Sequence, residues 1–218
     1  MTEADDQTRD ADLVAYYDNG VDARGEREPP VERQRRRAAF VELLRSEGRQ
    51  SILEVGAGPG RDGVALAAAL EYTGLDLSPR SVARCRALGR DVRVASVLQL
   101  PFDDGSFDAG WTMSTLLHVS NRDLTKALTE LVRVLLPGAP LAVGLWGGTD
   151  DHEMLWDDRM GYGPPRFFSM RSDDTLRAVL SEVGLVEEWA VWPGEPHHYQ
   201  WAVLRTPARP HGRDGSLA

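Results

Sequence analysis

Three glycines at alternate positions, Gly56, Gly58 and Gly60, follow an apolar run that includes Glu54. A second apolar run ends at Asp76, about twenty residues after the first glycine. Glycine lets a backbone approach a ligand closely, and an aspartate at this distance can accept hydrogen bonds from both hydroxyls of a ribose. The spacing therefore predicts a site for a cofactor that contains adenosine.

Two classes of cofactor fit these glycines. Gly58, Gly60 and Gly63 also spell the G-x-G-x-x-G pattern of a dinucleotide site, so a nicotinamide oxidoreductase is one alternative. Lys126 is the only lysine, and we find no tyrosine–lysine pair of the oxidoreductase kind. A carboxylate at Glu54 would repel a pyrophosphate at the following helix N-terminus. A cofactor with an ammonium group and no phosphate, such as S-adenosylmethionine, fits better.

Strands and helices alternate along the chain and must position these residues. Helices are predicted over 61–70, 78–88, 122–135 and 172–183, with Ser78 and Ser172 as caps. Strands are predicted over 51–55, 71–76, 91–95, 107–113, 140–145, 185–191 and 199–205. This alternation predicts an α/β fold with a doubly wound, mostly parallel sheet. Residues 192–198 are too few for a crossover helix, so the last two strands should pair antiparallel.

Five motifs in this order resemble the class I S-adenosylmethionine-dependent methyltransferases of the small-molecule type. The motifs are Glu54–Gly60, Gly74–Ser78, Leu100–Asp108, Leu117–Val119 and Arg133–Gly138. The resemblance covers about residues 50 to 145 closely and 166 to 205 loosely. It implies a Rossmann-like, seven-stranded sheet whose last strand is antiparallel, with S-adenosyl-L-methionine as the cofactor.

The resemblance also implies a set of cofactor contacts. The glycine loop would lie under the methionine part, and Asp76 would accept from the ribose. Ser96 stands where many members carry an aspartate toward the adenine amino group, and serine is a weaker acceptor. The residues expected to contact the cofactor are Glu54, Gly56, Ala57, Gly58, Gly60, Arg61, Asp76, Leu77, Ser96, Val97, Leu98 and Met113.

The candidate catalytic residues are His118 and Tyr17. His118 comes just after the fourth strand, at the edge where α/β proteins bind ligands, and could act as a general base or only line the site. Tyr17 lies on the N-terminal segment, which in the resembled family folds over the cofactor. The residues expected to contact the substrate are Tyr16, Trp146, Trp156, Arg166, Phe167 and His198. No metal site is expected.

The chain is predicted to form a single domain over residues 12–205. Within it, residues 12–47 should form an N-terminal helical lid and residues 146–168 a loop that contacts the substrate. Residues 1–11 and 206–218 are polar and without period, so disordered tails are expected there. The arginine run 33–37 is interpreted as a solvated helix face.

The charge and composition of the chain argue against nucleic acids and membranes as partners. The net charge of −9 argues against a nucleic-acid partner, which needs a basic face. Cys85 is the only cysteine, and no segment is apolar enough for a signal peptide or membrane helix. We therefore expect a cytoplasmic monomer or homodimer that contacts no membrane.

The sequence predicts methyl transfer from S-adenosylmethionine to an oxygen or nitrogen of a small molecule, a natural product being one candidate. Methylation of a protein or an RNA is one alternative. A non-catalytic protein that only binds S-adenosylmethionine is another. The nucleophile itself cannot be read from these residues.

Overall fold

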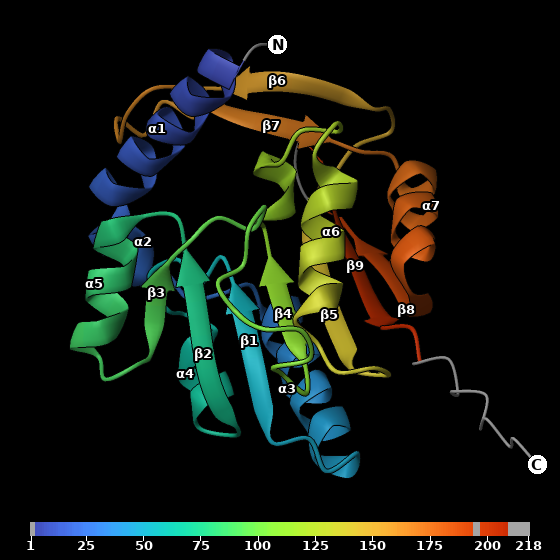
Figure 1. Cartoon of the computed structure of the whole chain (residues 1–218). Coiled ribbons are helices and arrows are strands. Elements are labelled where there is room, and N and C mark those ends of the chain that lie inside the picture. Colours follow the sequence, from blue (N-terminus) through green and yellow to red (C-terminus); the bar gives the residue numbers. More distant parts are fainter. Residues whose placement is uncertain (1–2, 194–196, 209–218) are drawn as a thin grey trace, which may run out of the picture.

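A seven-stranded sheet forms the centre of the protein in the computed structural model, which describes residues 3–193 and 197–208 (Figure 1). The strand order is β3-β2-β1-β4-β5-β9-β8. The first five strands run parallel, and β9 is antiparallel to both β5 and β8. This arrangement confirms the predicted fold class. The strands are β1 (Ser51–Val55), β2 (Glu71–Asp76), β3 (Val92–Val94), β4 (Gly110–Met113), β5 (Pro140–Gly147), β8 (Leu185–Trp192) and β9 (His198–Arg205).

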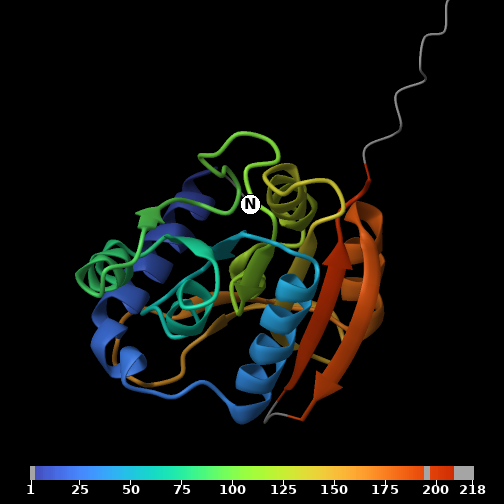
Figure 2. The same cartoon turned by 90° about the horizontal axis from the view of Figure 1, so that it is seen from below.

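Helices cover both faces of the sheet. On one face α6 (Leu124–Arg133) and α7 (Asp173–Val183) bury their apolar side chains, and on the other α3 (Val31–Ser46) and α4 (Gly63–Ala67) do so. Figure 2 shows α3 and α6 on opposite sides of the strands. The fifth helix, α5 (Pro79–Ala87), packs at the β3 edge.

Two serines begin helices as the sequence predicts. Ser78 Oγ accepts a hydrogen bond of 3.0 Å from the backbone N–H of Ser81, and Ser172 Oγ accepts one of 3.3 Å from Thr175. Each bond satisfies one of the N–H groups that have no partner within the first helical turn. The cap at Ser78 fixes where α5 starts, directly after Asp76 at the end of β2.

The N-terminal segment is helical where disorder was expected. Helix α1 spans Glu3–Asn19 and is followed by the short α2 (Val21–Gly25). The prediction of a disordered tail is therefore wrong for residues 3–11, while residues 1–2 lie outside the described part. Acidic residues near a helix N-terminus are favourable for the helix dipole, so a polar, acidic composition did not exclude a helix.

Residues 146–168, expected as a loop, contain a second, two-stranded sheet. Strand β6 (His152–Trp156) pairs antiparallel with β7 (Arg166–Met170). Figure 1 shows this hairpin and α1 together at the end of the molecule toward which the arrowheads of β1, β2 and β4 point. The carboxyl ends of the parallel strands are thus covered by α1 and the hairpin.

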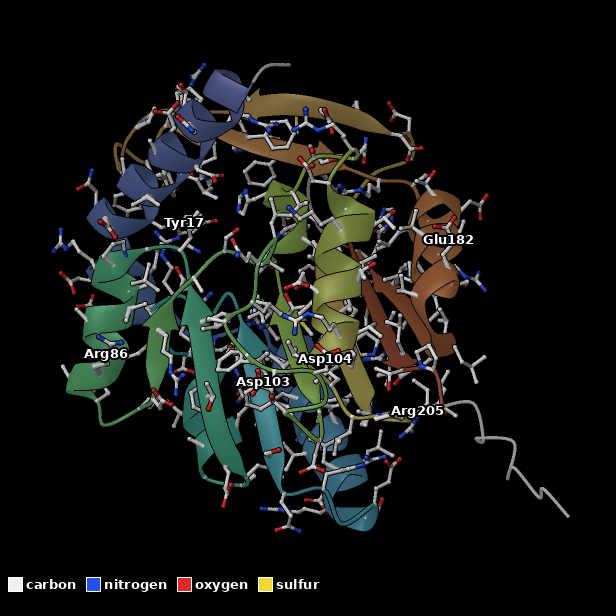
Figure 3. The ribbon with its side chains drawn as sticks, in the orientation of Figure 1. Tyr17, Arg86, Asp103, Asp104, Glu182 and Arg205 are labelled. Carbon is white, nitrogen blue, oxygen red and sulfur yellow. The ribbon has the colours of Figure 1, made fainter. Side chains whose placement is uncertain are left out.

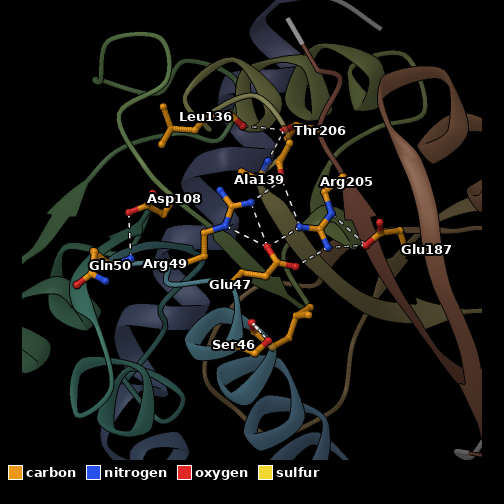
Figure 4. Close-up of polar contacts among 12 residues, drawn as sticks. Ser46, Glu47, Arg49, Gln50, Asp108, Leu136, Ala139, Glu187, Arg205 and Thr206 are labelled. Atoms are coloured by element: carbon orange, nitrogen blue, oxygen red, sulfur yellow. Dashed lines mark hydrogen bonds and ion pairs between the residues drawn. The ribbon is translucent and has the colours of Figure 1, made fainter.

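The opposite end carries a polar network around Arg205 (Figure 4). Arg205 contacts Glu47 after α3 and Glu187 on β8, with nitrogen–oxygen distances of 2.7 to 3.0 Å. The next residue, Thr206, is buried and exchanges backbone and side-chain hydrogen bonds with Ala139. The predicted disordered tail therefore does not begin at residue 206. Residues 209–218 lie outside the described part.

Of the described helices, none is long and apolar enough to cross a membrane.

Candidate active site

A cavity of about 1030 Å³ lies between the carboxyl ends of the strands, α1 and the β6–β7 hairpin. Of the predicted cofactor residues, all line this cavity except Glu54 and Gly60. Of the predicted catalytic and substrate residues, all line it except Tyr16 and His198. The fold therefore brings most of the predicted site into one space.

The glycine loop between β1 and α4 forms the floor of this cavity. Gly56 and Gly58 have φ angles of 82° and 53°, a region that residues with a side chain rarely occupy. A Cβ on Gly56 would lie 1.8 Å from Thr115 Oγ1, whereas the space beside Gly58 is open to 4 Å. Gly60, in contrast, faces Cys85 and Arg90 behind the loop, which is why it does not line the cavity.

Asp76 lies at the end of β2, beside this loop. Its Oδ2 accepts from the backbone N–H of Gly58 at 2.7 Å, and its Oδ1 accepts from Ser78 at 2.8 Å. A carboxylate offers about four acceptor positions, so about two remain for ligand hydroxyls. Burial raises the pKa of Asp76, and the two backbone hydrogen bonds oppose that shift.

Glu54 lies beneath the loop and not in the cavity. It is 2% exposed, and its Oε2 accepts a 2.6 Å hydrogen bond from the hydroxyl of Tyr72. Burial, with a smaller contribution from Asp62, raises the pKa of Glu54 to about 8. The carboxyl group is therefore mostly protonated at neutral pH. Repulsion of a pyrophosphate by a charged Glu54, as argued from the sequence, does not describe this site.

Asp62, at the N-terminal end of α4, joins a buried cluster that the sequence analysis missed. Its carboxylate accepts from Arg33 Nε at 2.7 Å, Arg37 Nη1 at 2.6 Å and Trp111 Nε1 at 3.1 Å. Burial acts to raise the pKa of Asp62, but the two arginines outweigh burial and lower it. The interpretation of the arginine run as a solvated face is thus wrong for Arg33 and Arg37, whose four-residue spacing puts them on one face of α3.

His118 lies in the one-turn 3-10 helix η1 (Leu116–His118) after β4, and both ring nitrogens have partners. Nδ1 is 2.9 Å from the carbonyl oxygen of Phe167, and Nε2 is 2.7 Å from the hydroxyl of Tyr17. Because a carbonyl oxygen only accepts, Nδ1 carries the ring proton and Nε2 accepts from Tyr17. Burial lowers the pKa of His118 to about 3, so the ring is neutral at pH 7. Figure 3 shows Tyr17 near the C-terminal end of α1.

Arg166, on β7, connects this pair to an acidic residue. Its Nη1 donates to the hydroxyl of Tyr17 at 3.2 Å, and its Nη2 donates to Asp158 at 2.7 Å. Its guanidinium lies 3.9 Å from the ring centre of Tyr16, whose hydroxyl also donates to Asp158. Tyr16 therefore packs against the guanidinium of Arg166 and helps to hold it in place. Tyr16 was expected to contact the substrate, but it does not line the cavity.

Aromatic side chains form the far wall of the cavity. The ring of Tyr199 stacks on Trp192 at 4.8 Å and meets the edge of Trp146 at 5.4 Å. Ser114 Oγ is 3.0 Å from the hydroxyl of Tyr199, and Ser114 has a φ of 57°, which is unusual for a residue with a side chain. Neither Ser114 nor Tyr199 carried a local sequence signal for this role.

His198 was expected to contact the substrate, but its side chain turns away. Its Nε2 is 2.8 Å from Asp173 at the start of α7, while its neighbour His197 lines the cavity. His197 lies one residue before β9 begins, and of the two histidines only His197 lines the cavity.

Comparison with known proteins agrees with this geometry. Residues 53–143 match the family model described as a methyltransferase domain. The chain is 31% identical over 186 residues to the O-methyltransferase rstn1 of Aspergillus nomiae, covering 78% of each protein. The chain belongs to the class I S-adenosylmethionine-dependent methyltransferases, which makes it an enzyme with S-adenosylmethionine as its cofactor.

One further protein is similar in sequence to about half of the chain, and one solved structure is similar in fold to nearly all of it. A tRNA (carboxymethyluridine(34)-5-O)-methyltransferase of Arabidopsis thaliana is 32% identical over 54% of this chain, but the match covers only 29% of that protein. The solved structure of a 1,6-didemethyltoxoflavin-N1-methyltransferase from Burkholderia thailandensis, with S-adenosylhomocysteine bound, has a TM-score of 0.73. It covers 95% of this chain and 91% of that one at 17% identity, a level that shows the fold alone.

Proposed function

We propose that this methyltransferase transfers the methyl group to an oxygen or nitrogen atom of a small aromatic molecule. The observation that carries the proposal is the hydrogen bond between the phenol of Tyr17 and His118 Nε2. It supports a phenol–imidazole pair that can take up the proton of a hydroxyl or amine on the acceptor. The names of the O-methyltransferase relative and of the N1-methyltransferase of similar fold agree with oxygen or nitrogen as the acceptor atom.

The residues around the glycine loop fit the cofactor. We assign the ribose hydroxyls to the remaining acceptor positions of Asp76, and the methionine part to the open space above Gly58. Arg33 and Arg37 together carry two positive charges against one on Asp62, and Arg33 lines the cavity. This excess of positive charge supports a place for the carboxylate of the methionine part. The residues 95–98 supply the wall for adenine.

The acceptor end needs a group that takes up a proton. When bound, the cofactor supplies a methyl group on a positively charged sulfur, and this sulfur is the leaving group of an in-line displacement. As the acceptor oxygen gains this methyl group, its own proton becomes strongly acidic and passes to the hydroxyl of Tyr17, which gives its proton to His118 Nε2. A weakly basic imidazole is sufficient for that step. Arg166, which donates to the oxygen of Tyr17, would hold that hydroxyl in place for this transfer.

The cofactor assignment is tested by calorimetry with S-adenosylhomocysteine. Asp76→Asn keeps the size of the side chain but removes its charge, so Kd should rise about 10- to 100-fold, as expected for a hydrogen bond to a charged group. Asp103→Asn, in an exposed turn (Figure 3), is the matched control and should bind as the wild type does. Equal affinities of Asp76→Asn and the wild type would contradict the assignment.

The acceptor class is tested by transfer of a labelled methyl group to a panel of phenols and aryl amines, with purified tRNA as a separate arm. His118→Asn keeps a donor for the carbonyl of Phe167 but removes Nε2, and should lower kcat about 10²- to 10⁴-fold. Transfer to tRNA and to none of the small molecules would replace this proposal with the macromolecular alternative.

A further inference from the structure

Arg171 is a fully buried arginine directly after β7. It is 0% exposed, and among the described residues no carboxylate lies within hydrogen-bond distance of its guanidinium. Burial lowers the pKa of Arg171 to about 10, so it stays charged at neutral pH. A buried charge without a direct counter-ion is costly, and an apolar side chain would fill the same volume without that cost. Packing alone therefore does not explain why an arginine occupies this buried position.

The donors of Arg171 hold both ends of the turn that carries His118. Nη1 donates to the carbonyl oxygen of Leu116 at 3.1 Å, and Nη2 donates to that of Val119 at 2.7 Å. Nε donates to the side-chain oxygen of Asn121 at 2.8 Å. A planar guanidinium fixes the directions of these donors relative to one another. The backbone on either side of His118 is thus held by one rigid group.

The same strand also orients the ring of His118. Phe167, four residues before Arg171, provides the carbonyl oxygen that accepts from His118 Nδ1. The backbone carbonyl of Arg171 accepts from the backbone N–H of Gly148, directly after β5, at 3.1 Å and from Gln200 Nε2 on β9 at 2.9 Å, so the position of Arg171 is itself fixed. Strand β7 and the residue directly after it therefore position both the backbone and the ring of His118.

We propose that Arg171 is a positioning residue for His118: the guanidinium of Arg171 fixes the η1 turn so that His118 Nδ1 stays on the carbonyl of Phe167 and His118 Nε2 stays on the hydroxyl of Tyr17. The proposal rests on the proposed role of His118 as the proton acceptor. Without the guanidinium, the buried carbonyl of Val119 would lose its donor and the turn would relax. The ring would then lose its single orientation, while the distant contacts of Asp76 with the glycine loop would remain.

The test uses nitrogen NMR of protein labelled at histidine, with S-adenosylhomocysteine bound and His118→Asn for assignment. In the wild type, His118 should show the Nδ1–H tautomer and stay neutral well below the ordinary histidine pKa of about 6.5. In Arg171→Met, the signal should become a mixture of tautomers and titrate closer to that ordinary value. Arg171→Lys, which can reach one carbonyl but not both, should lie between the two.

Calorimetry separates this proposal from the proposed function. The Kd of S-adenosylhomocysteine should change by less than about twofold in Arg171→Met, because the glycine loop and Asp76 are untouched. Arg177→Met, at an exposed arginine of α7 that stacks on Trp189, is the matched control. Failure of the wild type to bind would refute the proposed function, whereas a parallel loss of affinity in Arg171→Met would refute only the positioning role.

A milder variant covers the case in which Arg171→Met does not fold. Asn121 is exposed, and Asn121→Ala removes only the acceptor of Arg171 Nε and of Ser169 Oγ. It should shift the tautomer of His118 in the same direction but by less. A His118 signal identical to that of the wild type in Arg171→Lys and in Asn121→Ala would overturn the proposal.

Discussion

Glu54 and His118 are both buried at the carboxyl ends of β1 and β4, and burial moves their pKa values in opposite directions. It raises the pKa of Glu54 to about 8 and lowers that of His118 to about 3. In each case the uncharged form is favoured, because an interior of low polarity solvates a charge poorly. Each residue therefore gives the folding free energy its own pH dependence, and the two signs are opposite.

In the wild type, ionisation of Glu54 should lower the free energy of unfolding as the pH rises, and Glu54→Gln should abolish this decrease. The folded wild type keeps the proton of Glu54 up to about pH 8, while the unfolded chain releases it near pH 4.5. The free energy of unfolding therefore falls between these values, by as much as about 1.4 kcal/mol per pH unit. Urea unfolding from pH 5 to 8.5 should show this slope in the wild type and not in Glu54→Gln. A slope that persists in the variant would assign it to another group.

His118→Asn should remove a loss of stability at falling pH. The unfolded chain takes up a proton on His118 near pH 6.5, while the folded protein resists it down to about pH 3. The free energy of unfolding of the wild type therefore falls as the pH is lowered through this window. Urea unfolding between pH 7 and 4 should give a shallower decline for His118→Asn. A decline as steep in His118→Asn as in the wild type would assign the loss to another group.

Local sequence signals found some functional residues and could not find others. The glycines, Asp76 and His118 stand at strand ends, where spacing alone predicts their position. Asp62 directly follows the glycine loop, but its partners Arg33 and Arg37 lie on a helix about thirty residues earlier, and no local pattern links them. The positive φ of Ser114 depends on the turn after β4 and leaves no mark in the residue type.

At the scale of elements, polar contacts with α5 help to hold α1 over the cavity. Asp18 Oδ1 accepts from Ser78 Oγ at 2.5 Å and from the backbone N–H of Arg80 at 3.0 Å, both in the first turn of α5. Ser78 also donates its backbone N–H to Asp76. The position of α1 is therefore linked through one serine to the proposed ribose contact.

Asp18→Ala should loosen α1 without unfolding the sheet. The variant loses two hydrogen bonds to a carboxylate, a contact worth about 1.5–3 kcal/mol, so amide exchange along α1 should accelerate about tenfold or more. S-adenosylhomocysteine should slow this exchange in the wild type. Asp12→Ala, on the same helix but outside the contact with α5, is the control. Equal exchange in the two variants would mean that α1 is held by other contacts.

The element boundaries were predicted well in the sheet and poorly around it. Strands and capped helices of the sheet have strong periodicity and end at turn residues. Strands β6 and β7 instead lie among Gly, Asp and aromatic residues, and β6 pairs only with β7. Helix α1 is polar and is stabilised by contacts with α5 and β7. Such elements depend on tertiary contacts that a local pattern does not contain.

At the scale of the whole molecule, the Asp62 cluster ties helix α3 to the sheet. Arg33 and Arg37 come from α3, Trp111 from β4, and Asp62 from the turn that ends the glycine loop. The side chain of Asp62 is 0% exposed. One carboxylate thus connects three parts of the fold directly beneath the cofactor end of the cavity, so its loss should affect the stability of the entire domain.

Asp62→Asn should lower the free energy of unfolding by about 3–5 kcal/mol, because it leaves Arg33 and Arg37, whose side chains are only 13% and 14% exposed, without their counter-ion. The exposed pair of Arg45 and Glu42 on the same helix provides a control, since removal of a surface ion pair costs at most about 1 kcal/mol. Urea unfolding at pH 7 should show the midpoint of Asp62→Asn well below those of Glu42→Gln and the wild type, with an unchanged slope. If Asp62→Asn and Glu42→Gln unfolded at the same urea concentration, the cluster would contribute no more than a surface pair. The link between α3 and the sheet would then rest on the apolar contacts of Phe40, Val41 and Leu44.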